Sequence, residues 1–299
     1  MDSFITIFTP TYNRAHLLDR LYQNLCEQDY QNFEWLIIDD GSTDGTEELV
    51  NQWIEEAAFT IRYFKKENGG KHTAINKGVQ LAEGDLFFII DSDDVLAEDA
   101  LHKIKHYGEQ IKKKEEICGI IGLSQYLGQE KIVGDRFLYN EWEVSFADVY
   151  LKYHLKGDKS VAFKTEVLQQ YPFPEKQGVR FVFEAVVWHE MSKKYKVLAI
   201  NEVIQKKEYL HDGLTDSSYK KWYVNALAFS YFQLIKNRTY PFAQYPSHAL
   251  WNYIHLGINA LLSGKTYFKK LSLLDQLIYV AVYPRAFYSY LKLKDRLHD

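Results

Sequence analysis

The first hundred residues switch repeatedly between two hydrophobic patterns. Short runs rich in β-branched and aromatic residues indicate buried strands, and apolar residues three or four positions apart indicate helices with one apolar face. Strands that alternate with helices predict an α/β fold, with a mostly parallel sheet covered by helices on both faces. The expected strands are 4–9, 33–38, 60–64 and 86–90, and the expected helices are 15–28, 71–82 and one that begins at Asp44, an N-cap with Glu47 three residues later.

Polar clusters follow three of these strands directly, at residues 10–14, 39–44 and 91–94. Open α/β sheets bind ligands at the carboxyl ends of their strands. We therefore expect the three clusters to form one site.

The pattern beyond residue 95 is less regular. Residues 98–114 and 182–194 are expected helices, residues 118–124 and 196–205 are expected strands, and residues 125–180 show no clear periodicity. Strongly apolar helical segments with Lys and Arg at their ends follow. We predict an α/β body over residues 1–215 and a helical C-terminal region over residues 216–299.

Charge separates the predicted body from the C-terminal region. The whole chain carries a net charge of −4, yet residues 216–299 hold 11 Lys and Arg against 4 Asp, together with 18 aromatic residues. Such a surface fits nucleic acid or an anionic membrane. Because no apolar run reaches the roughly 18 residues of a spanning helix, we expect the region to lie on a membrane rather than cross it. The alternative is packing on the body or on a second copy, which would give a homo-oligomer.

The N-terminus and the cysteines indicate the compartment. The chain begins with a strand pattern and has no apolar stretch of signal-peptide length, and Cys26 and Cys118 show no metal-binding spacing. A reduced, cytoplasmic setting without a zinc site is the expectation.

The sequence DSDD, which follows a buried strand, is the strongest local indication of chemistry. Its acids Asp91, Asp93 and Asp94 would repel one another when buried, and a divalent cation would neutralise them. Hard oxygen ligands suit Mg²⁺ or Mn²⁺, which also bind the phosphates of a ligand. A polar turn that caps the next helix is the alternative.

The sequence NGGKHTAINKG over residues 68–78 places two glycines and Lys71 at the start of a helix. Backbone N–H groups at a helix start, together with a lysine, can hold a phosphate. Alone this motif, like DDGSTDGT at residues 39–46, is weak, and a glycine-containing turn explains either one.

The order of the motifs is far more specific. FTPTYNR, IIDDGSTDGT, ENGGKHTAINKG and LFFIIDSDD, which together span residues 8–94, resemble the donor-binding half of family 2 inverting glycosyltransferases of the GT-A fold. GDKSVAFKTEVL, FEAVVW and EYLHDGLT more loosely resemble bacterial members that build capsular, exopolysaccharide or teichoic-acid-type polymers. The resemblance implies nucleotide-sugar binding by residues 1–95 and an acceptor side in residues 96–215.

The resemblance also implies roles for individual residues. Pro10, Tyr12 and Arg14 would line the nucleotide pocket, and Asp40 would accept a hydrogen bond from the uracil ring. A buried partner of this kind discriminates well between bases because leaving it unpaired is costly. The residues implied near the sugar, the diphosphate and a Mn²⁺ or Mg²⁺ ion are Lys71, Asn76, Asp91 and Ser92 as donor contacts, and Asp93, Asp94 and His211 as metal ligands.

Inversion needs a general base that takes the proton of the acceptor hydroxyl. In the family this is the Asp of a Glu-Asp pair at a helix start, and here the pair is Glu184-Ala185. Glu184 is therefore the predicted base, with Glu190 and Asp158 as alternatives. The alternative is a purely structural role, in which Glu184 is a solvated acid at a helix start that the helix dipole favours.

These inferences predict a hexosyltransferase that moves a sugar from UDP-sugar to a lipid-linked glycan at the cytoplasmic membrane face, without a nucleic acid partner. Two alternatives stay open. A metal-dependent nucleotidyltransferase would carry a glycine-rich phosphate loop after the first strand, and FTPTYNR has no glycine. An inactive glycosyltransferase-like scaffold would agree with Ala185.

Overall fold

The computed structural model describes residues 3–177, 179–209, 230 and 245–298. The chain divides into two compact units. The first comprises Met1–Phe173 and Glu190–Glu208, and the second comprises Pro174–His189 and the chain from Tyr209 onward. The predicted boundary at residue 215 lies outside the described residues and stays a prediction.

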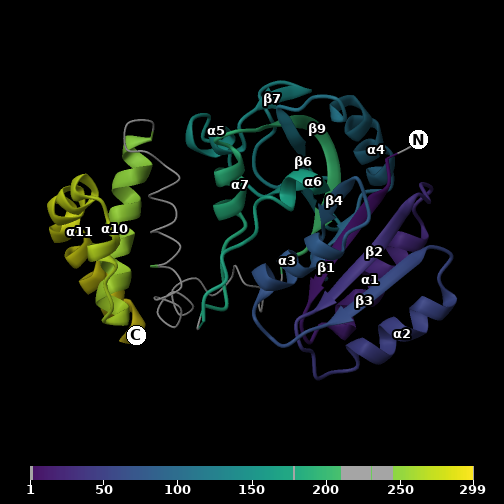
Figure 1. Ribbon diagram of the computed structural model, residues 1–299, viewed down its shortest axis with the longest axis horizontal. Coiled ribbons are helices and arrows are strands. Elements are labelled where there is room, and N and C mark those ends of the chain that lie inside the picture. Colours follow the sequence, from purple (N-terminus) through teal and green to yellow (C-terminus); the bar gives the residue numbers. More distant parts are fainter. Residues whose placement is uncertain (1–2, 178, 210–229, 231–244, 299) are drawn as a thin grey trace. The chain divides into compact units, whose positions relative to one another are not determined.

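The first unit is built on a nine-stranded mixed sheet with strand order β3-β2-β1-β4-β8-β6-β9-β5, and β7 pairs with β9 (Figure 1). β1 to β4 are parallel, as the strand-helix repeats predict, and β6 also pairs with β9 in parallel. β8 lies antiparallel between β4 and β6 and joins the two parallel parts. The strands are β1 (Ile5–Thr11), β2 (Phe33–Asp39), β3 (Thr60–Lys65), β4 (Leu86–Ile89), β5 (Val95–Leu96), β6 (Ile117–Tyr126), β7 (Trp142–Val144), β8 (Lys159–Lys164) and β9 (Lys196–Lys207).

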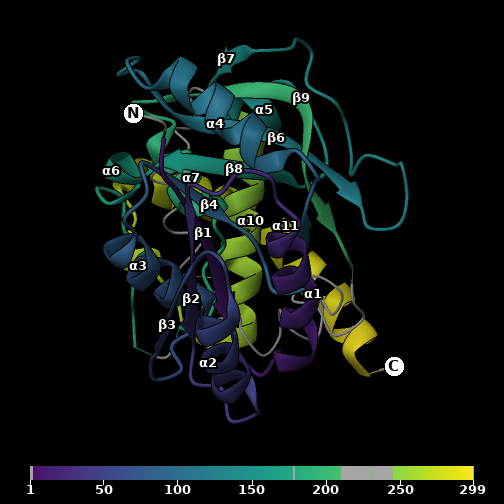
Figure 2. The same cartoon turned by 90° about the vertical axis from the view of Figure 1, so that its right-hand side faces the viewer.

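Helices cover both faces of the parallel strands, as predicted. Figure 2 shows α1 and α3 on opposite sides of β1. On one face, apolar side chains of α1, α2 and α4 pack with Ile7 and Trp35 in the main core. On the other face, Gly78 of α3 lies so close to the ring of Phe8 that a Cβ there would be 2.2 Å from it. The described helices of this unit are α1 (Ala15–Cys26), α2 (Thr46–Glu56), α3 (Lys71–Leu81), α4 (Ala100–Ile111), α5 (Phe146–Leu151) and α6 (Thr165–Leu168), while α7 (Ala185–Met191) runs from the second unit into the first.

The start of α2 differs from its prediction. Gly45 is the N-cap residue, and Asp44 precedes it. The Asp44 carboxylate accepts hydrogen bonds from the backbone N of Thr46 at 3.2 Å and of Ala15 at 3.1 Å. Glu47 forms an ion pair with Lys65 at 2.8 Å. The predicted cap at Asp44 is therefore wrong, because this carboxylate joins the starts of α1 and α2 instead.

A buried carboxylate interrupts the apolar strand β2. Glu34 is fully buried, and its carboxylate accepts hydrogen bonds from the Thr6 hydroxyl at 2.6 Å, the Glu83 backbone N at 2.8 Å and Arg62 at 2.7 Å. Arg62 also donates to the carbonyl of Leu81 at 2.9 Å. This network joins β1, β2 and β3 to the chain after α3.

We expect Glu34→Ala to lower the free energy of unfolding of the first unit by about 3 kcal/mol, because the Thr6 hydroxyl, the Glu83 backbone N and the partly buried Arg62 guanidinium lose a buried acceptor. Denaturant unfolding followed by tryptophan fluorescence would measure the change. Glu55→Ala, at an exposed position of α2, is the control and should leave the midpoint in place. An unchanged midpoint for Glu34→Ala would contradict this account.

The second unit contains two long helices that pack side by side, α10 (Pro246–Ser263) and α11 (Leu273–His298), joined by the short helix η1 (Phe268–Lys270) (Figure 1). Tyr253 and Leu256 of α10 pack with Tyr279 of α11 in one cluster, and Ile258 packs with Ala286 in another. A helical C-terminal region is thus confirmed for the part of it that the structure describes. Within the described residues, none of the helices combines the length and hydropathy that crossing a membrane requires.

Candidate active site

The parallel register brings the three polar clusters to one edge of the sheet. Thr11 at the end of β1 lies opposite Asp39 at the end of β2. The Asp40 backbone N donates to the carbonyl of Thr11 at 2.8 Å, and the Ile90 backbone N donates to that of Phe8 at 2.9 Å. Residues separated by eighty positions in the sequence therefore meet at the carboxyl ends of three neighbouring strands.

Asp39 and Asp40 have different environments although they are adjacent. Asp39 is fully buried, and its carboxylate accepts hydrogen bonds from the Ser42 backbone N at 2.7 Å and the Tyr63 hydroxyl at 2.5 Å. Burial and this carboxylate raise the pKa of Tyr63. Asp39 therefore shapes the turn after β2, while the side chain of Asp40 points to the glycine motif.

The Asp40 carboxylate binds the start of α3. One oxygen accepts from Lys66 Nζ at 2.6 Å and from the Gly69 backbone N at 2.9 Å, and the other accepts from the Gly70 backbone N at 2.7 Å. A carboxylate at a helix N-terminus is favoured by the helix dipole. Because a carboxylate offers about four lone-pair sites, the Asp40 side chain retains acceptor capacity for a ligand.

The local backbone explains the two glycines. Gly70 has a φ of 97°, which side chains disfavour, and a Cβ on Gly69 would lie 2.7 Å from the hydroxyl oxygen of Thr73. The motif therefore lets the chain turn tightly enough to direct two backbone N–H groups at Asp40.

Lys71, the first residue of α3, binds the first acid of DSDD. Its Nζ lies 2.6 Å from Asp91 Oδ1, and both side chains are partly exposed. Desolvation alone would raise the pKa of Asp91, but the charges of Lys71 and Lys207 hold it below its usual value. Asp91 therefore stays charged beside Lys71.

The pKa values of Asp93 and Asp94 shift in the opposite direction to that of Asp91. Burial raises the pKa of both, and the charge of Asp91 adds to the effect; for Asp94 the value reaches about 7 although Lys207 opposes the rise. Asp94 accepts hydrogen bonds from Gln205 Nε2 at 2.5 Å and from the Glu208 backbone N at 3.1 Å. Asp94 thus fastens the cluster to β9, whereas Asp93 is more exposed.

The three carboxylates fit a divalent cation. One oxygen from each of Asp91, Asp93 and Asp94 lies within 4.8 Å of the others. All are hard ligands, which suit Mg²⁺ or Mn²⁺. Burial, and after it the charge of Asp91, raises the pKa of Asp93 and Asp94, and a bound cation would favour their charged forms.

Comparison with known proteins identifies the part of the chain that carries these groups. Residues 6–130 match the family model for glycosyl transferase family 2. This segment of the chain is therefore similar to glycosyl transferase family 2. The four motifs that indicated this family, at residues 8–94, lie inside the matched segment.

Curated relatives match this chain over different lengths. An uncharacterized glycosyltransferase of Haemophilus influenzae is 38% identical over 99 residues, which are 33% of this chain and 40% of the relative. The "Putative teichuronic acid biosynthesis glycosyltransferase TuaG" of Bacillus subtilis is 24% identical over 229 residues, 74% of this chain and 86% of the relative. The Haemophilus match thus spans less than half of that relative, while the Bacillus match extends well beyond the segment that the family model matches.

Solved structures share the fold over nearly the whole chain. Staphylococcus aureus TarS 1–349 in complex with UDP-GlcNAc covers 97% of this chain and 92% of its own, with a TM-score of 0.56 and 17% identity. The mannosyltransferase PcManGT of Pyrobaculum calidifontis, in complex with GDP-Man and Mn²⁺, covers 98% and 85%, with a TM-score of 0.58 and 20% identity. These likenesses confirm the predicted GT-A-like α/β fold with C-terminal helices.

The residues predicted to line the nucleotide pocket follow β1. Pro10 is half-buried in the strand, Tyr12 is 48% exposed, and an Arg14 nitrogen lies 4.0 Å from Asp93 Oδ2. Between them Asn13 adopts a φ of 52°, and its backbone N donates to the Ser42 hydroxyl at 2.8 Å. The turns after β1 and β2 are thereby joined beside the family 2 motifs, and the donor contacts of all three residues stay a prediction.

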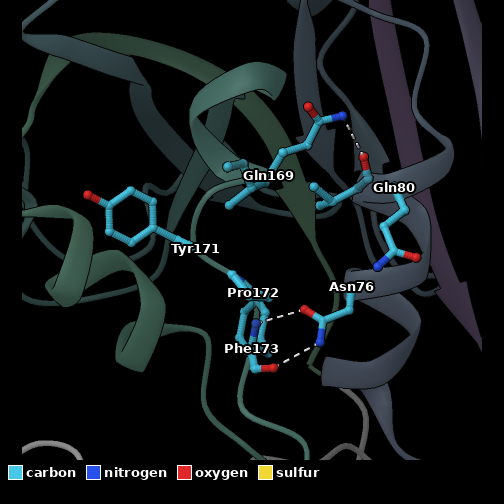
Figure 3. A pocket seen from close by; sticks show the side chains of 8 residues that line it. Asn76, Gln80, Gln169, Tyr171, Pro172 and Phe173 are labelled. Carbon is cyan, nitrogen blue, oxygen red and sulfur yellow. Dashed lines mark hydrogen bonds between the residues drawn. The ribbon is translucent and has the colours of Figure 1, made fainter.

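Asn76 makes two hydrogen bonds to one backbone position. Its Oδ1 accepts from the Phe173 backbone N at 2.7 Å, and its Nδ2 donates to the Phe173 carbonyl at 2.9 Å (Figure 3). Both groups line a pocket of about 290 Å³ between α3 and the segment after α6. Asn76 thus anchors the backbone at Phe173, where the first segment of the first unit ends. Its predicted contact with the sugar donor stays a prediction.

We expect Asn76→Ala to lower the free energy of unfolding by about 1–3 kcal/mol, because the peptide groups of Phe173 lose both partners. Asn76→Asp, which places a carboxylate oxygen against the Phe173 carbonyl, should destabilise at least as much. Gln80→Ala, in the same pocket, is the matched control. Calorimetric titration with UDP separates the roles: an anchor leaves the affinity unchanged, whereas a weaker affinity with unchanged stability would favour a donor contact.

The remaining predicted site residues, Ser92, Glu184 and His211, lie in different parts of the chain. Ser92 is buried between the acids of DSDD. Glu184 belongs to the second unit, is half-buried and directly precedes α7, where its carbonyl accepts from the backbone N of Val187 at 3.0 Å. Its role as the base stays a prediction. His211 lies outside the described residues.

Three cationic or polar side chains of the site were missed by sequence reasoning. They are Lys66, which binds Asp40, and Gln205 and Lys207, which lie on β9 near Asp94. Lys66 directly precedes ENGG and could have been found from that adjacency. The β9 pair has no such signal, because only pairing with β6 and β5 brings it to residues 91–94.

Proposed function

We propose that this protein is an inverting glycosyltransferase that moves a sugar from a UDP-sugar to a hydroxyl of a glycan acceptor. The observation that carries the proposal is the cluster of Asp91, Asp93 and Asp94 beside Lys71, at the same sheet edge as Asp40. A sugar diphosphate needs cationic groups for its phosphates and a selective partner for its base. This edge offers both, within the segment that is similar to glycosyl transferase family 2.

Each part of the donor has a candidate partner in this arrangement. Asp40 would accept a hydrogen bond from the base through its remaining lone pair, with its orientation held by Lys66, Gly69 and Gly70. Lys71 would exchange part of its contact with Asp91 for a phosphate oxygen. Asp91 would then be available to the ribose or the sugar, next to Ser92.

Asp93 and Asp94 would hold Mn²⁺ or Mg²⁺, together with His211 as the sequence resemblance implies. When bound, such an ion offsets the negative charge that develops on the departing diphosphate. Support comes from the ligand distances and from the Mn²⁺ complex of the structurally similar PcManGT. Glu184 would remove the proton of the acceptor hydroxyl as the oxygen attacks the anomeric carbon from the face opposite the diphosphate.

The acceptor is proposed to be a lipid-linked glycan in cell-surface polysaccharide synthesis, with the enzyme bound peripherally to the inner face of the membrane. Similarity to the Bacillus TuaG protein supports the polysaccharide setting. The basic, aromatic composition of residues 216–299 supports the membrane setting.

A donor panel tests the proposal. Purified full-length protein with Mn²⁺ would be titrated with UDP-GlcNAc, UDP-glucose, UDP-galactose and GDP-mannose, and hydrolysis of each would be followed by nucleotide release. We expect binding of at least one UDP-sugar, loss of that binding on chelation, and no binding of GDP-mannose. Binding of GDP-mannose alone would overturn the base assignment, and binding that chelation leaves unchanged would overturn the metal. Binding without turnover on any acceptor would favour the scaffold that Ala185 suggests.

A further inference from the structure

Helix α11 is apolar on two opposite sides. The side that meets α10 buries Tyr279, Ala286 and Leu293. Residues at the opposite angular positions would be polar in an ordinary surface helix. Here they are large apolar side chains that are exposed, namely Leu273, Leu277, Val280, Phe287, Tyr288 and Leu291.

The spacing of these six residues, which we call the outer stripe, places them on one face. Steps of three, four and seven positions keep side chains on the same side of a helix with 3.6 residues per turn. Leu273 is 76% exposed and Leu277 is 63% exposed. At 1.5 Å per residue, the outer stripe extends for about 27 Å along α11. The outer stripe therefore differs from singly scattered apolar residues, which are common.

Basic side chains border the outer stripe. Lys269 and Lys270 lie just before its first residue, and Arg285, Lys292 and Lys294 lie beside its second half, all of them exposed. The Lys292 ammonium lies 4.8 Å from the centre of the Tyr288 ring. Lys and Arg beside an apolar helix face can extend their charged ends toward anionic headgroups while their stems stay in apolar surroundings.

Few described acids oppose these charges. Asp275 is half-buried and accepts a hydrogen bond from the Tyr253 hydroxyl, so it belongs to the contact with α10. Asp295 is the exposed acid of α11 among the side chains that the structure describes, which end at residue 295. The surface around the outer stripe is therefore positively charged as well as apolar.

We propose that the outer stripe of α11 is a membrane-docking surface that lies in the plane of an anionic lipid bilayer. Apolar burial and attraction to anionic headgroups together give stable interfacial binding of an amphipathic helix. The charge decides between this occupant and a second copy of the chain, because two identical basic surfaces would repel each other. The inference depends on the second unit and not on the proposed activity.

Vesicle flotation of the full-length protein tests the docking surface. The probes are vesicles of phosphatidylcholine with 30 mol% phosphatidylglycerol and vesicles of phosphatidylcholine alone. We expect the protein to float with the anionic vesicles and to stay mostly unbound with the neutral ones. Absence of flotation with the anionic vesicles would overturn the proposal.

Two variants separate the contributions. Leu277→Ser with Leu291→Ser removes apolar area from the outer stripe, and Lys292→Gln with Lys294→Gln removes charge from its border. We expect each pair to weaken binding to the anionic vesicles at least tenfold. The matched control is Leu138→Ser, which replaces a leucine that is 52% exposed in the first unit and should bind like the unaltered chain.

Light scattering and UDP binding complete the test. If the serine pair converts an oligomer into a monomer and leaves flotation unchanged, the outer stripe contacts a second copy and the proposal is wrong. Unchanged UDP affinity of both pairs would show that the donor site is intact. If the serine pair fails to fold, the glutamine pair alone decides, because it replaces only exposed side chains.

Discussion

Asp93→Asn is expected to lower the turnover of sugar transfer by about a hundredfold to a thousandfold and to abolish its dependence on added Mn²⁺. Asp93 is the more exposed of the two acids whose pKa is raised by burial and by the neighbouring charge of Asp91. An amide is a neutral and weaker ligand for a hard cation, so the charge on the departing diphosphate would be poorly offset. Initial rates over a range of Mn²⁺ concentrations would measure both effects.

The choice of Asp93 avoids damage to the sheet. Asp94 accepts hydrogen bonds from Gln205 and from the Glu208 backbone, so its replacement would also disturb β9. Asp99→Asn is the matched control, since Asp99 forms an exposed ion pair with Lys103 at 2.9 Å. Unaltered rates and unaltered Mn²⁺ dependence in Asp93→Asn would remove Asp93 from the metal site.

Glu184→Gln is expected to lower the turnover by about a hundredfold or more while the affinity for UDP stays unchanged. A glutamine has nearly the same size but cannot take the proton of the acceptor hydroxyl, and general base catalysis contributes about 10²–10⁴ in rate. Single-turnover rates and calorimetric titration with UDP would separate chemistry from donor binding.

Two matched variants identify the base. Glu190→Gln, on the helix that follows Glu184, replaces an acid that pairs with Lys193 at 2.7 Å, and Asp158→Asn replaces an exposed acid near Lys207. We expect both to retain most of the turnover. If one of these variants loses most of its turnover while Glu184→Gln stays active, the replaced residue is the base instead. A biological function that survives all three replacements would instead favour a non-catalytic scaffold.

The predicted elements of the first hundred residues are confirmed to within a few residues, because their patterns are local. β1, β2 and β4 are mostly buried apolar runs, β3 is a partly exposed edge strand, and α1 and α3 have regular apolar spacing. Glu34 escaped notice because its three donors come from β1, β3 and the end of α3. β8 was missed because its six residues become a strand only through pairing with β4 and β6.

Lys159, which begins β8, shows how burial changes the interpretation of a charge. Lysine side chains mostly lie exposed at the surface of a protein. The side chain is nearly buried, and its Nζ donates to the carbonyls of Lys156 at 2.9 Å and of Val133 and Gly157 at 3.5 Å. Desolvation lowers the pKa of Lys159. These contacts make it a structural residue that joins the ends of two loops.

The sequence by itself determined the alternation of strands and helices, the carboxyl-end position of the polar clusters and the family resemblance, since all three depend on short-range patterns and on motif order. Only the tertiary structure decided how the acids of the site differ. In the structure, Asp40 anchors the start of α3, Asp91 pairs with Lys71, and Asp94 is linked to β9. Each of these contacts depends on groups that lie elsewhere in the sequence. The second apolar face of α11 likewise became evident only once packing against α10 had accounted for the first.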